Sequence, residues 1–142
     1  MDYLCDTNLM WRCFSDQSPD HRAIKYKIDT PLNAGNDICI TPQNLIEYHG
    51  VATRSVEANG LGMNVFEADR KAIQMKEHFS LPADTADIYV HWHKLILEYN
   101  VQSRQVHDAR LVAVMLTYGI THILTRNAAD FRRYQEITVV EI

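Results

Sequence analysis

Short apolar segments alternate with helix-length segments along this chain of 142 residues. The apolar segments predict buried strands over residues 3–5, 38–41, 122–124 and 137–140. Between them, helical segments are predicted over residues 8–14, 20–33, 42–53, 66–79, 85–99 and 108–118. Such alternation predicts an α/β fold in which helices flank a mainly parallel central sheet of four to five strands.

Glycine and proline mark several of the predicted boundaries. Pro42 follows the second predicted strand, and Gly119 ends the last predicted helix. Pro31 is expected to cut the second helix short. The helices over residues 66–79 and 85–99 follow each other without a strand between them, which predicts a helical hairpin inserted between the strand units.

Composition and charge limit the possible classes of protein. Hydrophobic residues make up 46% of the chain and charged residues 23%, so we expect a single globular domain over residues 1–142. The net charge of −4 is the wrong sign for gripping nucleic acid over a broad surface, so any such contact must be local. Three cysteines without CxxC spacing, no secretion signal and no long apolar run indicate a cytoplasmic protein with reduced thiols and no membrane contact.

Three acidic residues flank the predicted strands. Asp6 directly follows the first strand, Glu47 lies on the helix after the second, and Asp108 is predicted to open the last helix. In a parallel sheet, ligand sites lie outside the carboxyl ends of the strands, so all three can reach one edge. A carboxylate among apolar neighbours is costly unless a cation compensates its charge. The sequence therefore predicts a divalent-metal site.

The stretches that carry these residues resemble the PIN-domain ribonucleases and, within them, the VapC-like toxins of bacterial toxin–antitoxin pairs. They are LCDTN at residues 4–8, TPQNLIE at 41–47, VHDARLVA at 106–113 and ILTRNAADF at 123–131. Their order and spacing extend the resemblance over essentially the whole chain.

The resemblance implies a PIN-like fold and an endoribonuclease that hydrolyses RNA phosphodiesters with Mg²⁺ or Mn²⁺. Asp6, Glu47 and Asp108 are then the metal ligands, directly or through water, and any of them can orient the attacking water. Such carboxylates are the hard oxygen ligands that these cations prefer. The resemblance also implies a small antitoxin protein as partner and a homodimer.

The fourth ligand departs from the commonest family pattern. Asn127 stands where many members carry an aspartate, and Asp130 follows further along. We expect Asn127 to face the site and Asp130 to cap a short helix. Supporting roles are predicted for Asn8, as the cap of the first helix or a contact of metal-bound water, and for Asn44 and Thr125.

Structural interpretations remain open beside the functional ones. Asp6 and Asp108 are residue types that often cap helices, and Glu47 can be a solvated helix residue. Arg110 and Arg126 are candidate RNA phosphate contacts or ordinary surface charges. The alternative function is a PIN-like RNA- or protein-binding module with weak or no catalysis. A receiver-type phosphoacceptor is disfavoured, because no lysine follows the last strand.

Overall fold

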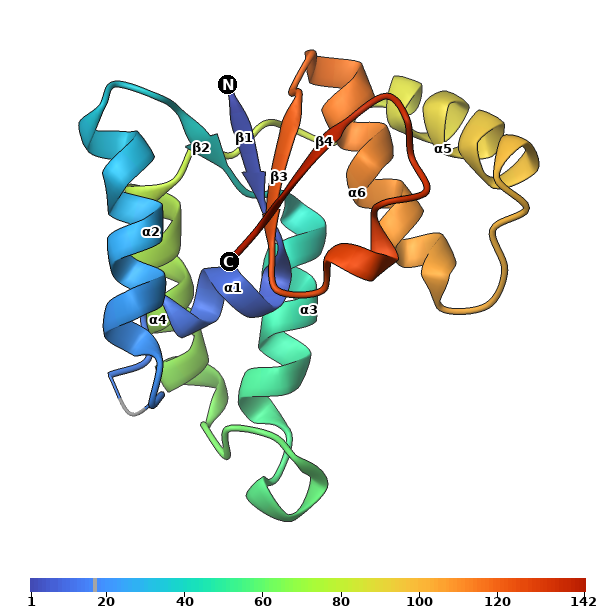
Figure 1. The fold of residues 1–142 in the computed structure, drawn as a ribbon. Helices are drawn as coiled ribbons and strands as arrows, with labels where there is room; N and C mark the ends of the chain where they lie inside the picture. Colours follow the sequence, from blue (N-terminus) through green and yellow to red (C-terminus); the bar gives the residue numbers. More distant parts are fainter. Residues whose placement is uncertain (17) are drawn as a thin grey trace.

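A four-stranded parallel sheet forms the centre of the computed structural model, which describes residues 1–16 and 18–142 (Figure 1). The strands lie in the order β2 (Ile38–Cys39), β1 (Tyr3–Cys5), β3 (His122–Thr125) and β4 (Thr138–Glu141), and every neighbouring pair is parallel. The prediction of a mainly parallel sheet flanked by helices is therefore confirmed. Because the order is not sequential, helices connect the strands across the faces of the sheet.

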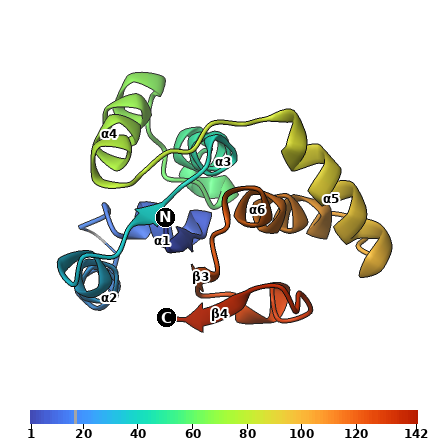
Figure 2. The same cartoon turned by 90° about the horizontal axis from the view of Figure 1, so that it is seen from above.

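Helices cover both faces of this sheet (Figures 1 and 2). There are also two short 3-10 helices in the described residues: η1 follows helix α3, and η2 follows strand β3. No helix within residues 1–16 and 18–142 is both long and apolar enough to cross a membrane. The bounds are α1 Thr7–Arg12, α2 His21–Asn33, α3 Pro42–Thr53, η1 Val56–Ala58, α4 Val65–His78, α5 Ala86–Glu98, α6 Gln105–Tyr118 and η2 Ala128–Asp130.

Alternate residues of each central strand pack into two different cores. Leu4 of β1 and Ile123 of β3 pack with α5 and α6. Their neighbours Cys5 and Leu124 pack with the helices α1 to α4. This alternation follows from the two-residue period of a strand, and it explains why both faces of the sheet need helical cover.

The predicted helical hairpin is wrong. Ala68 and Met75 of α4 are buried in the core that also contains α1, α2 and α3. Ile88 and Leu95 of α5 are buried in the other core, which contains α6 (Figure 2). The two helices follow each other in the sequence, but each buries its apolar stripe against a different layer of the fold.

Helix α2 includes Pro31 and ends two residues after it at Asn33, which is the predicted end of this helix. Proline interrupts a helix by removing one backbone donor and by crowding the preceding turn. Here it lies close to the helix end, where few backbone bonds remain to be lost. Its carbonyl accepts a hydrogen bond from the Asn36 backbone at 3.0 Å, which helps to close the helix.

Candidate carboxylate site

Asp6 combines a structural role with a place at the carboxyl edge of the sheet. It is the N-cap of α1, and its Oδ1 accepts a hydrogen bond from the Thr7 backbone at 2.8 Å. Its Oδ2 accepts a hydrogen bond from the Thr125 hydroxyl, also at 2.8 Å. Burial raises the pKa of Asp6, the two hydrogen bonds lower it, and the charges of Glu47 and Asp130 raise it. The carboxyl is thus held rigidly in an electrostatically unfavourable place.

Glu47 is half-buried on α3 and is not a freely solvated residue. The Thr7 hydroxyl donates to its Oε2 at 2.8 Å, and the Gln43 amide donates to its Oε1 at 2.7 Å. Asn44 supports this arrangement, because its amide donates to the Thr7 hydroxyl at 2.8 Å. Asn44 is itself fixed by a capping box with Thr41 at the start of α3.

Asp108 does not open α6, as the sequence predicted. The helix begins at Gln105, and Arg104 occupies the N-cap position without a side-chain cap bond. The backbone amides of Val106 and His107 already bond the carbonyls of the preceding turn, which places Asp108 inside the helix. The interpretation of Asp108 as a helix cap is therefore wrong, and its carboxylate can instead take part in the site.

The pKa of Asp108 is raised to about 7. Burial contributes most to this shift, followed by the charges of Asp6, Asp130 and Glu47, while Arg104 acts in the opposite direction. Asp6 is likewise affected by Glu47 and Asp130. The charges of Asp6, Glu47 and Asp130 therefore all disfavour the ionised form of Asp108.

The segment after β3 differs from its prediction. Asp130 does not begin the short helix η2 but is its last residue. Asn127 takes the N-cap position with an exposed side chain that makes no cap hydrogen bond. Its backbone amide donates to the buried Thr125 hydroxyl at 2.9 Å. Asp130 raises the pKa of both Asp6 and Asp108, whereas a place for the Asn127 side chain in the site stays a prediction.

The remaining predicted site residues have other contacts. Asn8 does not cap α1, since Asp6 does, and its side chain accepts a hydrogen bond from the Trp11 indole at 3.3 Å. Arg126 forms an ion pair with Asp20. Arg110 donates to the Gln43 side chain at 3.2 Å and forms an ion pair with Asp84 at 3.3 Å.

Sequence reasoning missed two residues that contact the site, Thr7 and Gln43. Both hold Glu47 by hydrogen bonds. Gln43 precedes Glu47 by four residues on the same helix, and this spacing places side chains side by side, so the signal was present. The contact of Thr7 spans 40 residues of sequence, and no local pattern encodes it.

The donors of this site fit Mg²⁺ or Mn²⁺ in chemical type, because all are hard oxygen atoms. Within residues 1–16 and 18–142, no three histidine, cysteine, aspartate or glutamate side chains already stand together as a set of metal ligands. Glu47 and Asp130 raise the pKa of both Asp6 and Asp108, however, and Asp6 raises that of Asp108. Mutual repulsion of this kind is what a divalent cation relieves, so these residues fit the cation electrostatically.

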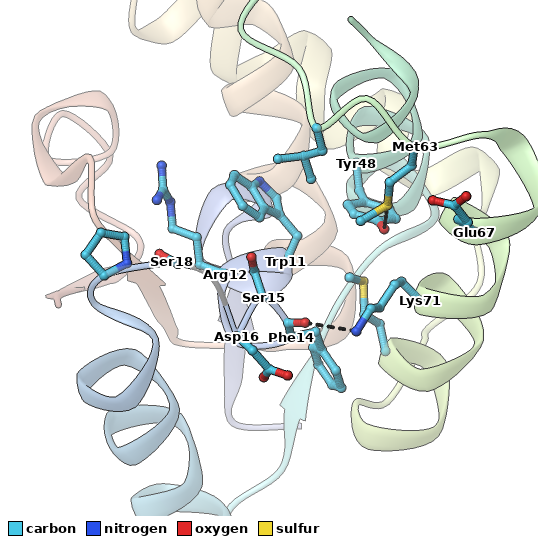
Figure 3. A pocket seen from close by; sticks show the side chains of 13 residues that line it. Trp11, Arg12, Phe14, Ser15, Asp16, Ser18, Tyr48, Met63, Glu67 and Lys71 are labelled. Atoms are coloured by element: carbon cyan, nitrogen blue, oxygen red, sulfur yellow. Dashed lines mark hydrogen bonds between the residues drawn. The ribbon is translucent and has the colours of Figure 1, made fainter. Parts of the chain in front are cut away.

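A separate pocket of about 510 Å³ lies beyond the end of α1 and is bounded by α3 and α4 (Figure 3). Trp11 and Tyr48 contribute aromatic surface, and Lys71 donates to the Phe14 carbonyl at 3.3 Å. The Arg12 guanidinium lies over the Trp11 ring, 4.6 Å from its centroid. None of the site carboxylates lines this pocket, so it is distinct from the carboxylate site.

Comparisons with known proteins show similarity in structure but not in sequence. No family model and no curated protein matches the chain. Among solved structures, VapBC2 from Rickettsia felis bound to a promoter DNA fragment is 15% identical, with a TM-score of 0.75 over 100% of this chain and 99% of the other. VapBC-1 from nontypeable Haemophilus influenzae is 14% identical, with a TM-score of 0.72 over 99% and 98%.

A third similar structure is VapC20 from Mycobacterium tuberculosis, described as a Sarcin-Ricin loop cleaving toxin. It is 18% identical, with a TM-score of 0.61 over 86% of this chain and 87% of the other. At these identities the similarity establishes the fold alone. The chain therefore has the PIN-like fold of the VapC-type toxins, and the predicted fold class is confirmed.

Proposed function

We propose that this protein is a Mg²⁺- or Mn²⁺-dependent endoribonuclease and the toxin of a toxin–antitoxin pair. The observation that carries the proposal is that hydrogen bonds through Thr7 and Gln43 hold Glu47 beside Asp6, at the end of a parallel strand, and beside the backbone that carries Asp108. The charges of Glu47 and Asp130 raise the pKa of both Asp6 and Asp108, which agrees with this arrangement. Coupled carboxylates would repel a phosphodiester unless a cation accompanied them. The similarity in fold to VapC20, which is described as a Sarcin-Ricin loop cleaving toxin, adds support.

Asp6, Glu47 and Asp108 would hold the cation, and Asp130 is the acidic residue best placed to complete the set. A bound Mg²⁺ or Mn²⁺ supplies a more acidic water and offsets charge on the phosphoryl oxygens. The protein supplies orientation: Thr125 and the Thr7 backbone hold Asp6 through one hydrogen bond to each oxygen. Because the pKa of Asp108 is about 7, cation uptake competes with a proton there and should strengthen as the pH rises.

The proposed partners are an RNA substrate, a small antitoxin protein and a second copy of the chain, all in the cytoplasm. Several similar structures are toxin–antitoxin complexes, which supports the antitoxin. Exposed apolar side chains on α4 and α5 support association, since Phe66 is 76% exposed and Leu97 70% exposed. A homodimer should give twice the monomer mass in light scattering, and a monomer at high concentration would contradict this part of the proposal.

The activity can be tested with purified protein, RNA and Mn²⁺. We expect cleavage that stops in EDTA and falls at least ~10²-fold in the Asp108→Asn variant. Asp69→Asn is the matched control, because Asp69 is an exposed carboxylate on α4, a helix that carries none of the site carboxylates. Undiminished cleavage by Asp108→Asn would refute the role of this carboxylate, whereas loss of cleavage in both variants would point to damage unrelated to the site.

Two observations favour a second function, an RNA- or protein-binding module without catalysis. The residue directly after Thr125-Arg126 is the neutral Asn127, and the site carboxylates are not arranged as a ready set of ligands within the described chain. Such a module would retain RNA in a gel-shift assay and release no fragments at any Mn²⁺ concentration. Metal-dependent fragments would exclude it.

A further inference from the structure

We propose that Gln43 and Arg110 form a clamp that sets the placement of Glu47 relative to Asp108 and thereby controls how tightly the site binds a divalent cation. This inference rests on the proposed function, because it concerns the same site. Both are positioning residues in this proposal. Arg110, which the sequence suggested as an RNA contact, receives a different role.

The Gln43 side chain connects the two helices that carry these carboxylates. Its amide nitrogen donates to Glu47 Oε1 at 2.7 Å on α3 and to the His107 carbonyl at 2.8 Å on α6. An amide nitrogen has two hydrogens, so both donors are used. His107 directly precedes Asp108, so Gln43 links the Glu47 carboxylate to the backbone beside the second carboxylate.

Arg110 fixes which way this amide points. Its Nη1 donates to Gln43 Oε1 at 3.2 Å, so the amide oxygen must face the guanidinium and the amide nitrogen must face Glu47. The other guanidinium nitrogen, Nη2, pairs with Asp84 on the connection between α4 and α5, at 3.3 Å. The charge of Arg110 is thus compensated by Asp84, outside the site. Its contact with the site is the hydrogen bond that orients the Gln43 amide.

The clamp orients Glu47 without neutralising it. The other oxygen of Glu47 accepts from the neutral Thr7 hydroxyl at 2.8 Å. Among the ion pairs of residues 1–16 and 18–142, none involves Glu47. Neutral donors leave the full negative charge of a carboxylate available to a cation, whereas a lysine or arginine at this contact would compete with it.

A role in cation binding follows from these contacts. Oxygen ligands bind a divalent cation well only when other residues already hold them in place, and loss of such supporting residues typically costs 10- to 100-fold in metal affinity. Gln43→Leu keeps a side chain of similar size but removes both donors and the acceptor. We therefore expect it to weaken Mn²⁺ binding about 10-fold.

The test measures Mn²⁺ affinity without RNA, by electron paramagnetic resonance of the free ion. Arg110→Met should weaken binding less than Gln43→Leu, and the double variant should bind no more weakly than Gln43→Leu alone, because Arg110 acts through Gln43. Arg132→Met is the control, since Arg132 makes an exposed ion pair with Glu141. It should bind Mn²⁺ as the wild type does.

Several results would overturn the clamp. These are wild-type affinity in folded Gln43→Leu, or losses in the two single variants that simply add in the double variant. If Gln43→Leu does not fold, Gln43→Asn provides the same test, because its shorter side chain cannot span from Glu47 to the His107 carbonyl. A wild-type protein that binds Mn²⁺ but cuts no RNA would refute the ribonuclease alone, and one that binds no Mn²⁺ would refute both proposals.

Discussion

Removing the charge of Asp108 should stabilise the metal-free protein, in contrast to most substitutions at partly buried positions. The pKa of this carboxyl is raised from 3.8 to about 7, so the fold opposes its ionisation. A raised carboxyl pKa leaves stability complete below the unfolded value and reduces it as the pH rises towards the folded value. At neutral and alkaline pH, therefore, the wild type carries a penalty that Asp108→Asn lacks.

The size of this penalty follows from the two pKa values. Their difference corresponds to about 4 kcal/mol for a fully buried group. Asp108 is only half-buried, so solvent screening reduces the figure to about 2 kcal/mol. Part of it is already present at pH 5, because the unfolded carboxyl is ionised there. Between about pH 5 and about pH 8, the advantage of Asp108→Asn should grow by about 1 kcal/mol.

The assay is urea unfolding in EDTA of the wild type and Asp108→Asn at both pH values. Comparing the same pair across pH removes any constant cost of burying the asparagine amide. Asp69→Asn, at an exposed position on α4, should show no such pH dependence. With saturating Mn²⁺ the order should reverse, because the wild type alone gains the full binding energy. A stability difference that stays constant with pH in EDTA would refute the raised pKa of Asp108.

Two further predictions concern the neighbours of Asp108. Thr125→Val removes the hydroxyl that donates to Asp6 and accepts from the Asn127 backbone, so we expect the free energy of unfolding to fall by about 1–3 kcal/mol. The pKa of Asp6 should rise further, because the lost hydrogen bond lowered it. NMR titration measures this pKa, and an unchanged value would contradict the prediction. Asp130→Asn should lower the pKa of Asp108 and weaken Mn²⁺ binding, because it removes a nearby negative charge. Asn127→Ala should change neither. If only Asn127→Ala weakens Mn²⁺ binding, Asn127 is the fourth ligand.

The sequence alone determined the layered architecture, because that depends on local patterns. Alternating strand and helix segments predict a parallel sheet, and a carboxylate directly after a strand must lie at its carboxyl edge. Asp6 could therefore be selected without a structure, and Glu47 was selected because the helix that follows the second strand can bring it to the same edge. Helix α3 was predicted with its observed bounds, since Thr41-Pro42 is a strong local start signal.

Only the tertiary structure decided which sheet face each helix covers and how the carboxylates are held. An apolar stripe shows that a helix is buried but not against which layer, so α4 and α5 were wrongly paired. The contacts of Glu47 with Thr7 and of Arg110 with Gln43 join segments 40 and 67 residues apart. The effect of Asp130 on the pKa of Asp108 likewise joins η2 to α6, two elements that are separate in the sequence. Such contacts form only when the layers pack, so no short stretch of sequence contains them.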